Sequence, residues 1–196
     1  TNLNHATKTV TVKLNNGHET TLSYDQVVVT AGAVSRTFPI PGVADNAIGL
    51  KTVEEAVEIR NRILTNFDKA AQLPKGPERD RLLTTVVVGG GFAGIETFAE
   101  LRSLASALLK DYPEIDFEDT HFHLIEAMGR IMPEVSEKTA QWVVENLESK
   151  GAPIHLNTQL VSAVGGVIEM STGEKYESDV IVWTAGDRKS TRLNSS

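Results

Sequence analysis

Several common features are scarce or missing in this 196-residue chain, which has no cysteine, three methionines and 6% aromatic residues. Without cysteine, these residues can form no disulfide, no thiolate metal site and no redox-active thiol pair. No apolar run approaches the ~18 residues that a membrane-spanning helix needs. The 19 basic residues are outnumbered by 26 acidic ones, and the net charge of −7 argues against a nucleic-acid partner, which needs a basic face.

The composition that is present is that of a folded protein. Hydrophobic residues make up 40% of the chain, and there are 15 glycines. This balance is ordinary for a globular domain and argues against disorder. The length suggests one domain or two small ones, with enough apolar surface to bury a core.

The first segment predicts strands. Residues 8–14 alternate polar and apolar side chains, residues 15–17 supply turn chemistry, and residues 19–23 can return as the partner strand. Residues 24–32 then predict a buried strand, because the apolar run at 27–29 is continuous, as in a parallel sheet. This strand ends in small residues, where something must approach the backbone closely.

A connector and a helix follow. Residues 38–42 contain two prolines, so they cannot form a helix and are expected to be a connector. Thr52 and Glu55 have the spacing of a capping box, and apolar residues recur at helical spacing from Val53 to Ala71. The prolines of residues 74–77 end this helix, and a second unit begins near there.

The second unit begins with a strand of β-branched residues at 84–88 that leads directly into a glycine-rich loop at 89–94. A long helix is predicted from Ile95 to Leu109, and the next strand, residues 122–125, is closed by Glu126. The glycine pattern alone is weak evidence. It becomes informative here because the loop lies between a predicted strand and a predicted helix, and a second strand follows.

The rest of the second unit predicts one more helix and further strands. Ser136 can cap a helix that Gly151 ends. Residues 154–156 and 180–186 predict short and buried strands, and residues 161–176 contain two hairpin-like turns. We expect both tryptophans, Trp142 and Trp183, to lie in the core.

The loop has the pattern Gly89-x-Gly91-x-x-Gly94, which is typical of dinucleotide binding. Gly89 allows a tight turn, Gly91 lets the backbone approach a pyrophosphate, and Gly94 lets helix and strand pack closely. The following helix start offers unpaired N–H groups and a partial positive charge. The alternative is a glycine-rich turn that binds no ligand.

Glu126 stands where a dinucleotide fold places an acid that binds the adenosine ribose, although it follows the loop at a greater distance than the ~20 residues usual. Its charge would repel a 2′-phosphate, which favours NADH over NADPH. Two observations keep alternatives open: an acid at a strand end can simply be solvated, and nearby Arg130 could accommodate a 2′-phosphate.

Glu96 lies in the first turn of the helix after the loop, where an acid either compensates the helix dipole or lies beside the nicotinamide. The two histidines His121 and His123 share one face of a strand, but no third ligand has useful spacing. We therefore predict no metal site and interpret the histidines as a pair on an edge strand.

With these residues in hand, the chain resembles the flavoproteins with two dinucleotide-binding domains, and within them the type II NADH dehydrogenases, or NADH:quinone oxidoreductases. Residues 111–116, inserted after a lengthened helix, are the most discriminating part, because most disulfide-reductase relatives lack them. The stretches that carry the resemblance are residues 24–32, 38–43, 50–56, 89–96, 111–116 and 183–186.

The resemblance implies an α/β fold in which a Rossmann-like NADH-binding domain is inserted into an incomplete FAD-binding domain. Residues 1–45 are expected to belong to the FAD-binding domain, and residues 46–186 to the linking helix and the NADH-binding domain with its parallel sheet and β-meander. The implied FAD contacts are Thr30, Ala31 and Gly32. The implied NADH contacts are Gly89, Gly90, Gly91, Phe92, Ala93, Gly94 and Glu126. Glu96 is implied to be catalytic, near the nicotinamide.

The implied activity is hydride transfer from NADH to FAD and electron transfer to a quinone. We expect the chain to be the middle of a longer protein, inactive by itself and with apolar edges at residues 27–29 and 180–183. We interpret residues 187–196 as a non-native tail. The full protein is expected to be cytoplasmic, to contact the inner face of the cell membrane through a C-terminal segment, and to form a homodimer.

Two other interpretations remain open at this point. A relative with the same domains can reduce a disulfide, a ferredoxin or a rubredoxin instead of a quinone. From a different class, the chain could be a nucleotide-binding module without catalytic activity.

Overall fold

The structure, a computed structural model, describes residues 2–30, 33–35 and 38–189, and these divide into two units, 1–32 and 33–196. The first unit is a three-stranded antiparallel sheet of β1 (Asn2–Asn4), β2 (Thr9–Lys13) and β3 (Glu19–Ser23). The predicted hairpin is confirmed, with Thr9 opposite Ser23. Strand β1 was not expected from the sequence.

The strand predicted at residues 24–32 is wrong over the residues described, since 24–30 form none. Val27, Val28 and Val29 are exposed, Val28 to 82%. A buried parallel strand needs a neighbouring strand and a covering layer on both faces. The described part of this unit supplies neither for these valines. They are exposed as expected, but they form no strand and therefore no strand edge.

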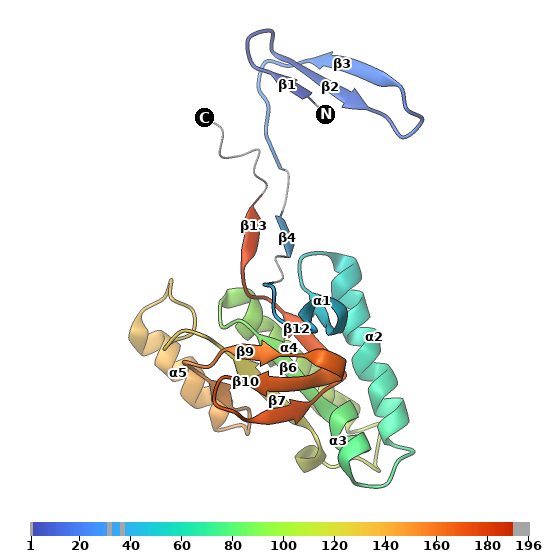
Figure 1. The fold of residues 1–196 in the computed structure, drawn as a ribbon, viewed down its shortest axis with the longest axis vertical. Helices are drawn as coiled ribbons and strands as arrows, with labels where there is room; N and C mark the ends of the chain where they lie inside the picture. The colour runs from blue at the N-terminus through green and yellow to red at the C-terminus, as the bar shows by residue number, and fades with distance from the viewer. Residues whose placement is uncertain (1, 31–32, 36–37, 190–196) are drawn as a thin grey trace. The chain divides into compact units, whose positions relative to one another are not determined.

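The second unit is built on a five-stranded parallel sheet (Figure 1). Its strand order is β5-β12-β6-β7-β8, and this sheet confirms the α/β fold class. The strands are β5 (Ala47–Gly49), β12 (Val180–Trp183), β6 (Thr84–Val88), β7 (His121–Ile125) and β8 (Ile154–His155). Every pairing between neighbours is parallel, and Val88 at the end of β6 lies opposite Trp183 and Ile125.

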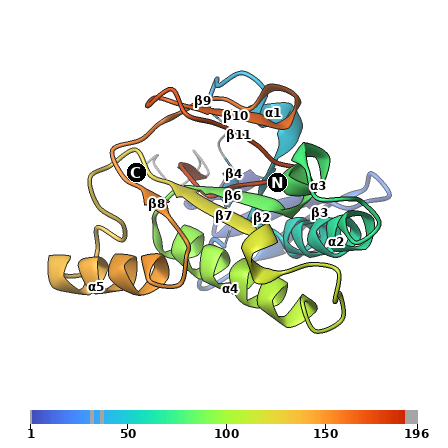
Figure 2. The ribbon, with the colours of Figure 1, turned by 90° about the horizontal axis from the view of Figure 1, so that it is seen from below.

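Helices cover one face of this sheet and a β-meander covers the other (Figure 2). The helices are α2 (Val53–Ala70), α4 (Phe92–Leu108) and α5 (Glu137–Glu148). The meander consists of β9 (Leu160–Ser162), β10 (Val167–Met170) and β11 (Lys175–Glu177), with η2 (Val164–Gly166) between the first two. The sheet has a hydrophobic core on each face, and alternate residues of β6 contribute to each. Val87 packs with the helices, whereas Val86 and Val88 pack with the meander.

Local signals set the ends of the helices. The Thr52 hydroxyl accepts from the Glu55 N–H while Glu55 accepts from the Thr52 N–H, which confirms the capping box. Ser136 caps α5 through the Thr139 N–H, also as expected. Two short helices, α1 (Val43–Asn46) and α3 (Pro77–Leu83), were not predicted. None of the helices in the described ranges is long and apolar enough to cross a bilayer.

Three further expectations need correction. Strand β12 lies between β5 and β6, so residues 180–183 are buried and do not form an apolar edge. Strand β7 lies between β6 and β8, so His121 and His123 are not on an edge strand. Trp183 is in the core as expected, but Trp142 is 63% exposed on α5. Strand order and helix facing depend on contacts between distant segments, which local periodicity does not report.

Residues just after Gly186 continue in regular structure. Strand β13 (Asp187–Lys189) pairs antiparallel with β4 (Ala33–Ser35). The remaining tail, residues 190–196, lies outside the described residues. The domain boundaries and the non-native origin of residues 187–196 stay predictions.

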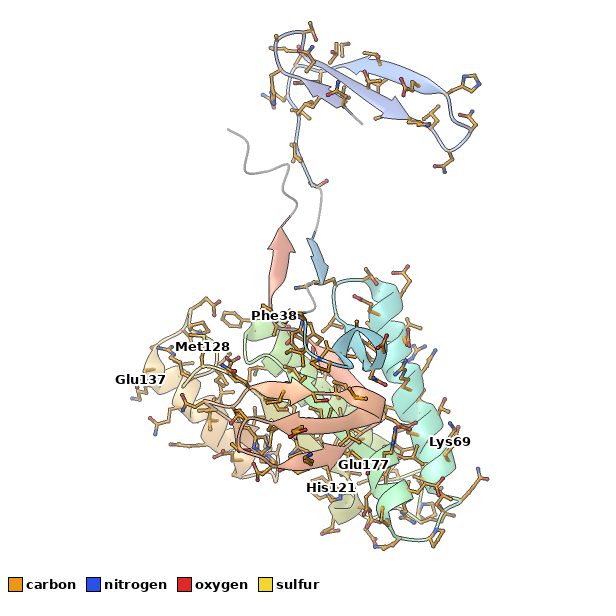
Figure 3. The ribbon with its side chains drawn as sticks, viewed as in Figure 1. Phe38, Lys69, His121, Met128, Glu137 and Glu177 are labelled. Atoms are coloured by element: carbon orange, nitrogen blue, oxygen red, sulfur yellow. The ribbon has the colours of Figure 1, made fainter. Side chains whose placement is uncertain are left out.

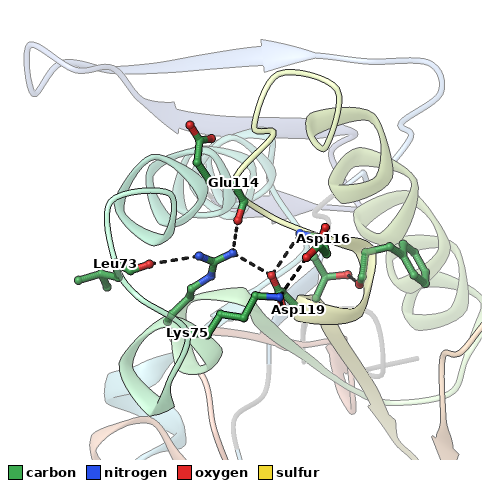
Figure 4. A network of polar contacts seen from close by, with 8 residues as sticks. Leu73, Lys75, Glu114, Asp116 and Asp119 are labelled. Atoms are coloured by element: carbon green, nitrogen blue, oxygen red, sulfur yellow. Dashed lines mark hydrogen bonds and ion pairs between the residues drawn. The ribbon is translucent and has the colours of Figure 1, made fainter.

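The segment between α4 and β7 is fixed by a buried arginine (Figure 4). Arg79 is 5% exposed and donates to the carbonyls of Leu73 and Glu114 and, at 2.8 Å, to Asp119 in η1 (Phe117–Asp119). Lys75 adds an ion pair to Asp119 at 2.9 Å. Burial raises the pKa of the Asp119 carboxyl, but hydrogen bonds from Lys75 and the Asp116 N–H, with the charges of Lys75 and Arg79, outweigh it and leave that pKa lowered.

Candidate dinucleotide-binding site

The glycine loop lies at the carboxyl end of the parallel sheet, between β6 and α4. Ligands of open α/β sheets bind at this end, where loops leave the strands. Gly89 adopts φ +114°, which permits the sharp turn out of β6. At Gly94 an added Cβ would overlap the Gly89 carbonyl oxygen, so this glycine allows α4 to pack against the strand end.

Gly91 has a different role from its neighbours in the loop. Its φ of −71° suits any residue, and a Cβ added there would meet nothing within 4 Å. The space beside it is therefore open to a ligand. Gly91 is also the N-cap of α4, and no side chain of the described residues caps that end. The first-turn N–H groups and the positive end of the helix dipole thus face an open position suited to an anion.

Glu126 joins the end of β7 to the glycine loop. Its Oε2 accepts from the Gly90 N–H at 2.5 Å, and its Oε1 accepts from the Met128 N–H at 2.7 Å. The backbone N–H of Glu126 donates to the backbone carbonyl of His155 in β8, which fixes the main chain next to the carboxylate. The carboxylate is half-buried and retains acceptor capacity for ribose hydroxyls beside the loop.

Arg130 is directed toward backbone carbonyls in the segment that leads into α5. Its Nη2 donates to the Val135 carbonyl at 2.5 Å and approaches that of Met132 at 3.4 Å. The Nε atom is buried with no hydrogen-bond partner in the described residues. In this arrangement the guanidinium supports the loop after Glu126, and the structure does not bring it to Glu126.

An apolar cavity of about 370 Å³ lies between the loop, Glu126 and the meander. The Phe38 ring, labelled in Figure 3, meets Trp183 edge-on at one wall, with the ring centroids 5.8 Å apart. The apolar lining includes Phe38, Ile40, Val88, Ile125, Leu160 and Trp183. A larger cavity of about 770 Å³ lies along α2 and is lined mainly by polar side chains, with no residue of the glycine loop among them. We place the site at the loop because Gly91 has open space beside it and begins α4, and Gly90 next to it is hydrogen-bonded to the Glu126 carboxylate.

Comparison with known proteins identifies the family. The family model described as pyridine nucleotide-disulphide oxidoreductase matches residues 1–196. The chain belongs to this family. The resemblance predicted from the sequence is thereby confirmed, and the relatives below agree with it.

Curated members of the family include type II enzymes. The chain is 35% identical over 178 residues to the external alternative NADH-ubiquinone oxidoreductase of Yarrowia lipolytica mitochondria, covering 85% of this chain and 30% of that protein. It is 31% identical over 182 residues to the type II NADH:quinone oxidoreductase of Haemophilus influenzae, covering 87% and 41%. The chain thus spans less than half the length of these relatives.

A solved structure has the same fold. NDH2 from Plasmodium falciparum, determined in complex with NADH, superposes with a TM-score of 0.81 at 22% identity. The match covers 96% of this chain and 40% of that one.

Glu96 does not line the cavity beside the glycine loop. Glu96 is exposed on α4 and lines a separate cavity of about 440 Å³ with Leu50, Ala56 and Ile59. Thr30 is exposed and belongs to the first unit, while Ala31 and Gly32 lie outside the described residues. The roles of Glu96, Thr30, Ala31 and Gly32 stay predictions, as do the ligand contacts of the loop and Glu126.

Sequence reasoning missed a half-buried aromatic stack on the meander face of the sheet. His123 of β7 lies 3.1 Å from His155 of β8, Nδ1 to Nε2, and stacks on Tyr176 of β11 at 4.0 Å between ring centroids. Burial, with the nearby His155 and His121, lowers the pKa of His123 to about 4. No group of three candidate metal ligands occurs in the described residues. Only the pairing of distant strands could reveal this stack.

Proposed function

We propose that this chain is the NADH-binding part of a type II NADH:quinone oxidoreductase, in which hydride passes from NADH to FAD and electrons pass to a quinone. The names of the curated relatives support this activity. Since the chain spans 30% and 41% of their lengths, the activity of a whole enzyme is inferred by similarity.

The observation that carries the proposal is the open position at Gly91, which caps α4 and directly follows the Gly90 N–H that the Glu126 carboxylate holds. In the proposed complex, first-turn N–H groups of α4 bind the pyrophosphate, and Glu126 accepts hydrogen bonds from the adenosine ribose. The same negative charge would disfavour a 2′-phosphate. The hydride chemistry belongs to the cofactors, and the protein binds and orients the nicotinamide nucleotide. We assign Glu96 to the nicotinamide end.

A flavin fits the family but cannot be built from the described residues. Of its three implied contacts only Thr30 is described, and it lies in a unit whose position relative to the glycine loop is not defined. Contact with the inner face of the cell membrane and a homodimeric state belong to the same proposal, supported by similarity to quinone-reducing relatives.

Titration of the 196-residue chain with NADH and NADPH tests the nucleotide part. Enhanced nicotinamide fluorescence should report saturable NADH binding and markedly weaker NADPH binding. Gly91→Ala is the sharpest variant, because a methyl group there disturbs no neighbour yet occupies the space proposed for the phosphate. Absence of NADH binding, or equal binding by the Gly91→Ala variant, would overturn the assignment of this site.

The acceptor is tested with a protein that carries this chain at full length and retains its flavin. It should oxidise NADH with a soluble quinone analogue, and far more slowly with a disulfide, ferredoxin or rubredoxin. A preference for one of these other acceptors would contradict the quinone part of the proposal while leaving the NADH site intact.

A further inference from the structure

The side chain of Thr184 lies against the first turn of the glycine loop. Thr184 follows directly after β12, and its N–H extends the β12–β6 ladder by donating to the Val88 carbonyl at 2.9 Å. Its hydroxyl Oγ1 lies 3.0 Å from the Val88 carbonyl oxygen and 3.2 Å from that of Gly89. The single hydroxyl proton of Thr184 is thus shared between the two carbonyls where β6 turns into the loop.

Two of the three motif glycines make room for this hydroxyl. A Cβ added at Gly89 would lie 2.6 Å from the Thr184 Oγ1, and one added at Gly94 would lie 2.7 Å from it. Both distances are too short for real contacts between these atoms. The absence of a side chain at Gly89 and Gly94 therefore lets the Thr184 hydroxyl come close to the loop, and at Gly94 it also lets α4 pack against the end of β6.

The Gly89–Gly90 peptide group is held at both ends. In a trans peptide the carbonyl and the N–H point in opposite directions and turn together as one plane. Here the Gly89 carbonyl accepts from the Thr184 hydroxyl, while the Gly90 N–H donates to Glu126 at 2.5 Å. Rotation of this peptide would break both contacts, so the hydroxyl and the carboxylate constrain the same plane from opposite sides.

We propose that Thr184 is a positioning residue for nucleotide binding, whose hydroxyl fixes the Gly89–Gly90 peptide and so orients Glu126 toward the ribose. This inference rests on the proposed function, because it concerns the nucleotide that the loop would bind. In this proposal Thr184 acts without a direct contact to the nucleotide. Its influence passes through one peptide group to the acid that is expected to select NADH.

The test compares four forms of the 196-residue chain by NADH and NADPH titration. Thr184→Val keeps the shape and removes the hydroxyl, whereas Thr184→Ser keeps the hydroxyl. The matched control is Thr84→Val, because Thr84 is buried at the opposite end of β6 and its hydroxyl also donates to a carbonyl, that of Asp80. Losing one neutral hydrogen bond should weaken NADH binding by about fivefold in Thr184→Val.

The remaining outcomes separate a positioning role from a structural one. Thr184→Ser should bind NADH as the unchanged chain does, and Thr84→Val should lower the unfolding midpoint without changing NADH affinity. Thr184→Val should also narrow the preference for NADH over NADPH, because Glu126 is then less well oriented. If Thr184→Val and Thr84→Val bind NADH equally, or if Thr184→Ser binds as weakly as Thr184→Val, the inference is wrong.

Further variants and a second measurement keep the inference testable if Thr184→Val does not fold or if the chain binds no NADH. If Thr184→Val does not fold, Thr184→Ala and Thr184→Ser decide by the same comparison. In the ligand-free chain, amide hydrogen exchange of Gly90 should be faster in the Thr184 variants without a hydroxyl and unchanged in Thr84→Val. Unchanged exchange at Gly90 overturns the inference. If the unchanged chain binds no NADH, the proposed function fails, and the exchange result alone shows whether Thr184 holds the peptide.

Discussion

The Glu126 carboxylate accepts a hydrogen bond from the Gly90 N–H at 2.5 Å, so the acid that ends β7 and the loop that leaves β6 form one structural unit. The second carboxylate oxygen is held by Met128. The acid is therefore oriented before any nucleotide arrives, and less ordering is required when one binds.

Glu126→Gln should reduce the preference for NADH over NADPH. The variant keeps one carbonyl acceptor but loses the charge, and hydrogen bonds to charged groups are worth about 1.5–3 kcal/mol against ~1 kcal/mol for neutral ones. We expect NADH affinity to fall by roughly tenfold while NADPH affinity falls less or rises. Glu134→Gln is the control, because Glu134 is exposed in the same segment and the charge change is identical. An unchanged preference in Glu126→Gln would refute the role of this acid.

Gly91→Ala and Gly94→Ala should separate ligand binding from stability. Alanine at Gly91 meets open space at a φ of −71°, so the free energy of unfolding should stay within ~0.5 kcal/mol of the original while NADH binding weakens. Alanine at Gly94 collides with the Gly89 carbonyl and should cost about 2 kcal/mol or more. Urea unfolding and NADH titration measure the two effects, and equal destabilisation by both variants would contradict this division.

Replacing the buried Arg79 should be far more costly than replacing an exposed arginine. Arg79→Met leaves the carbonyls of Leu73 and Glu114 without the guanidinium, and Asp119 keeps only its contacts with Lys75 and the Asp116 N–H. This loss should cost about 2–4 kcal/mol of unfolding free energy. Arg62→Met removes only an exposed pair with Glu58 at the i,i+4 position and should cost under ~1 kcal/mol. Chemical unfolding of both variants gives the comparison, and similar losses would show that the network in Figure 4 contributes little.

The His123 stack should make the second unit less stable in acid. In the fold the pKa of His123 is lowered from 6.5 to about 4, so between these values the unfolded chain binds a proton that the folded chain does not. The free energy of unfolding is therefore not reduced by His123 above pH 6.5. It falls as the pH decreases from 6.5 toward 4, by up to ~3 kcal/mol in total. The nearby His155, whose pKa burial also lowers, adds in the same direction.

Urea unfolding at pH 7.5 and pH 5 checks the effect of His123. His123→Gln should lose clearly less stability between these two pH values than the unchanged chain, whatever its stability at pH 7.5. An equal loss in both proteins would show that His123 is not protonated on unfolding in this range. His155 remains in the variant and should leave a smaller residual dependence on pH.

Local chemistry by itself determined the elements that carry the nucleotide site. The capping box of Thr52 and Glu55, the β-branched strand 84–88 and the glycine spacing act over a few residues, and the structure has them where the sequence predicted them. The position of Glu126 after a strand was readable for the same reason, since parallel strands present their carboxyl ends at one edge of the sheet.

Only the tertiary structure decided which distant residues meet. Strand order places Thr184 beside Gly89 and pairs His123 with His155, and neither contact has a local signal. Burial also depends on partners. The apolar run at residues 180–183 is buried between two strands, whereas the similar run at 27–29 is exposed because nothing in the described part of its unit covers it. Apolar sequence supplies the tendency to be buried, but the neighbouring segments determine whether burial occurs.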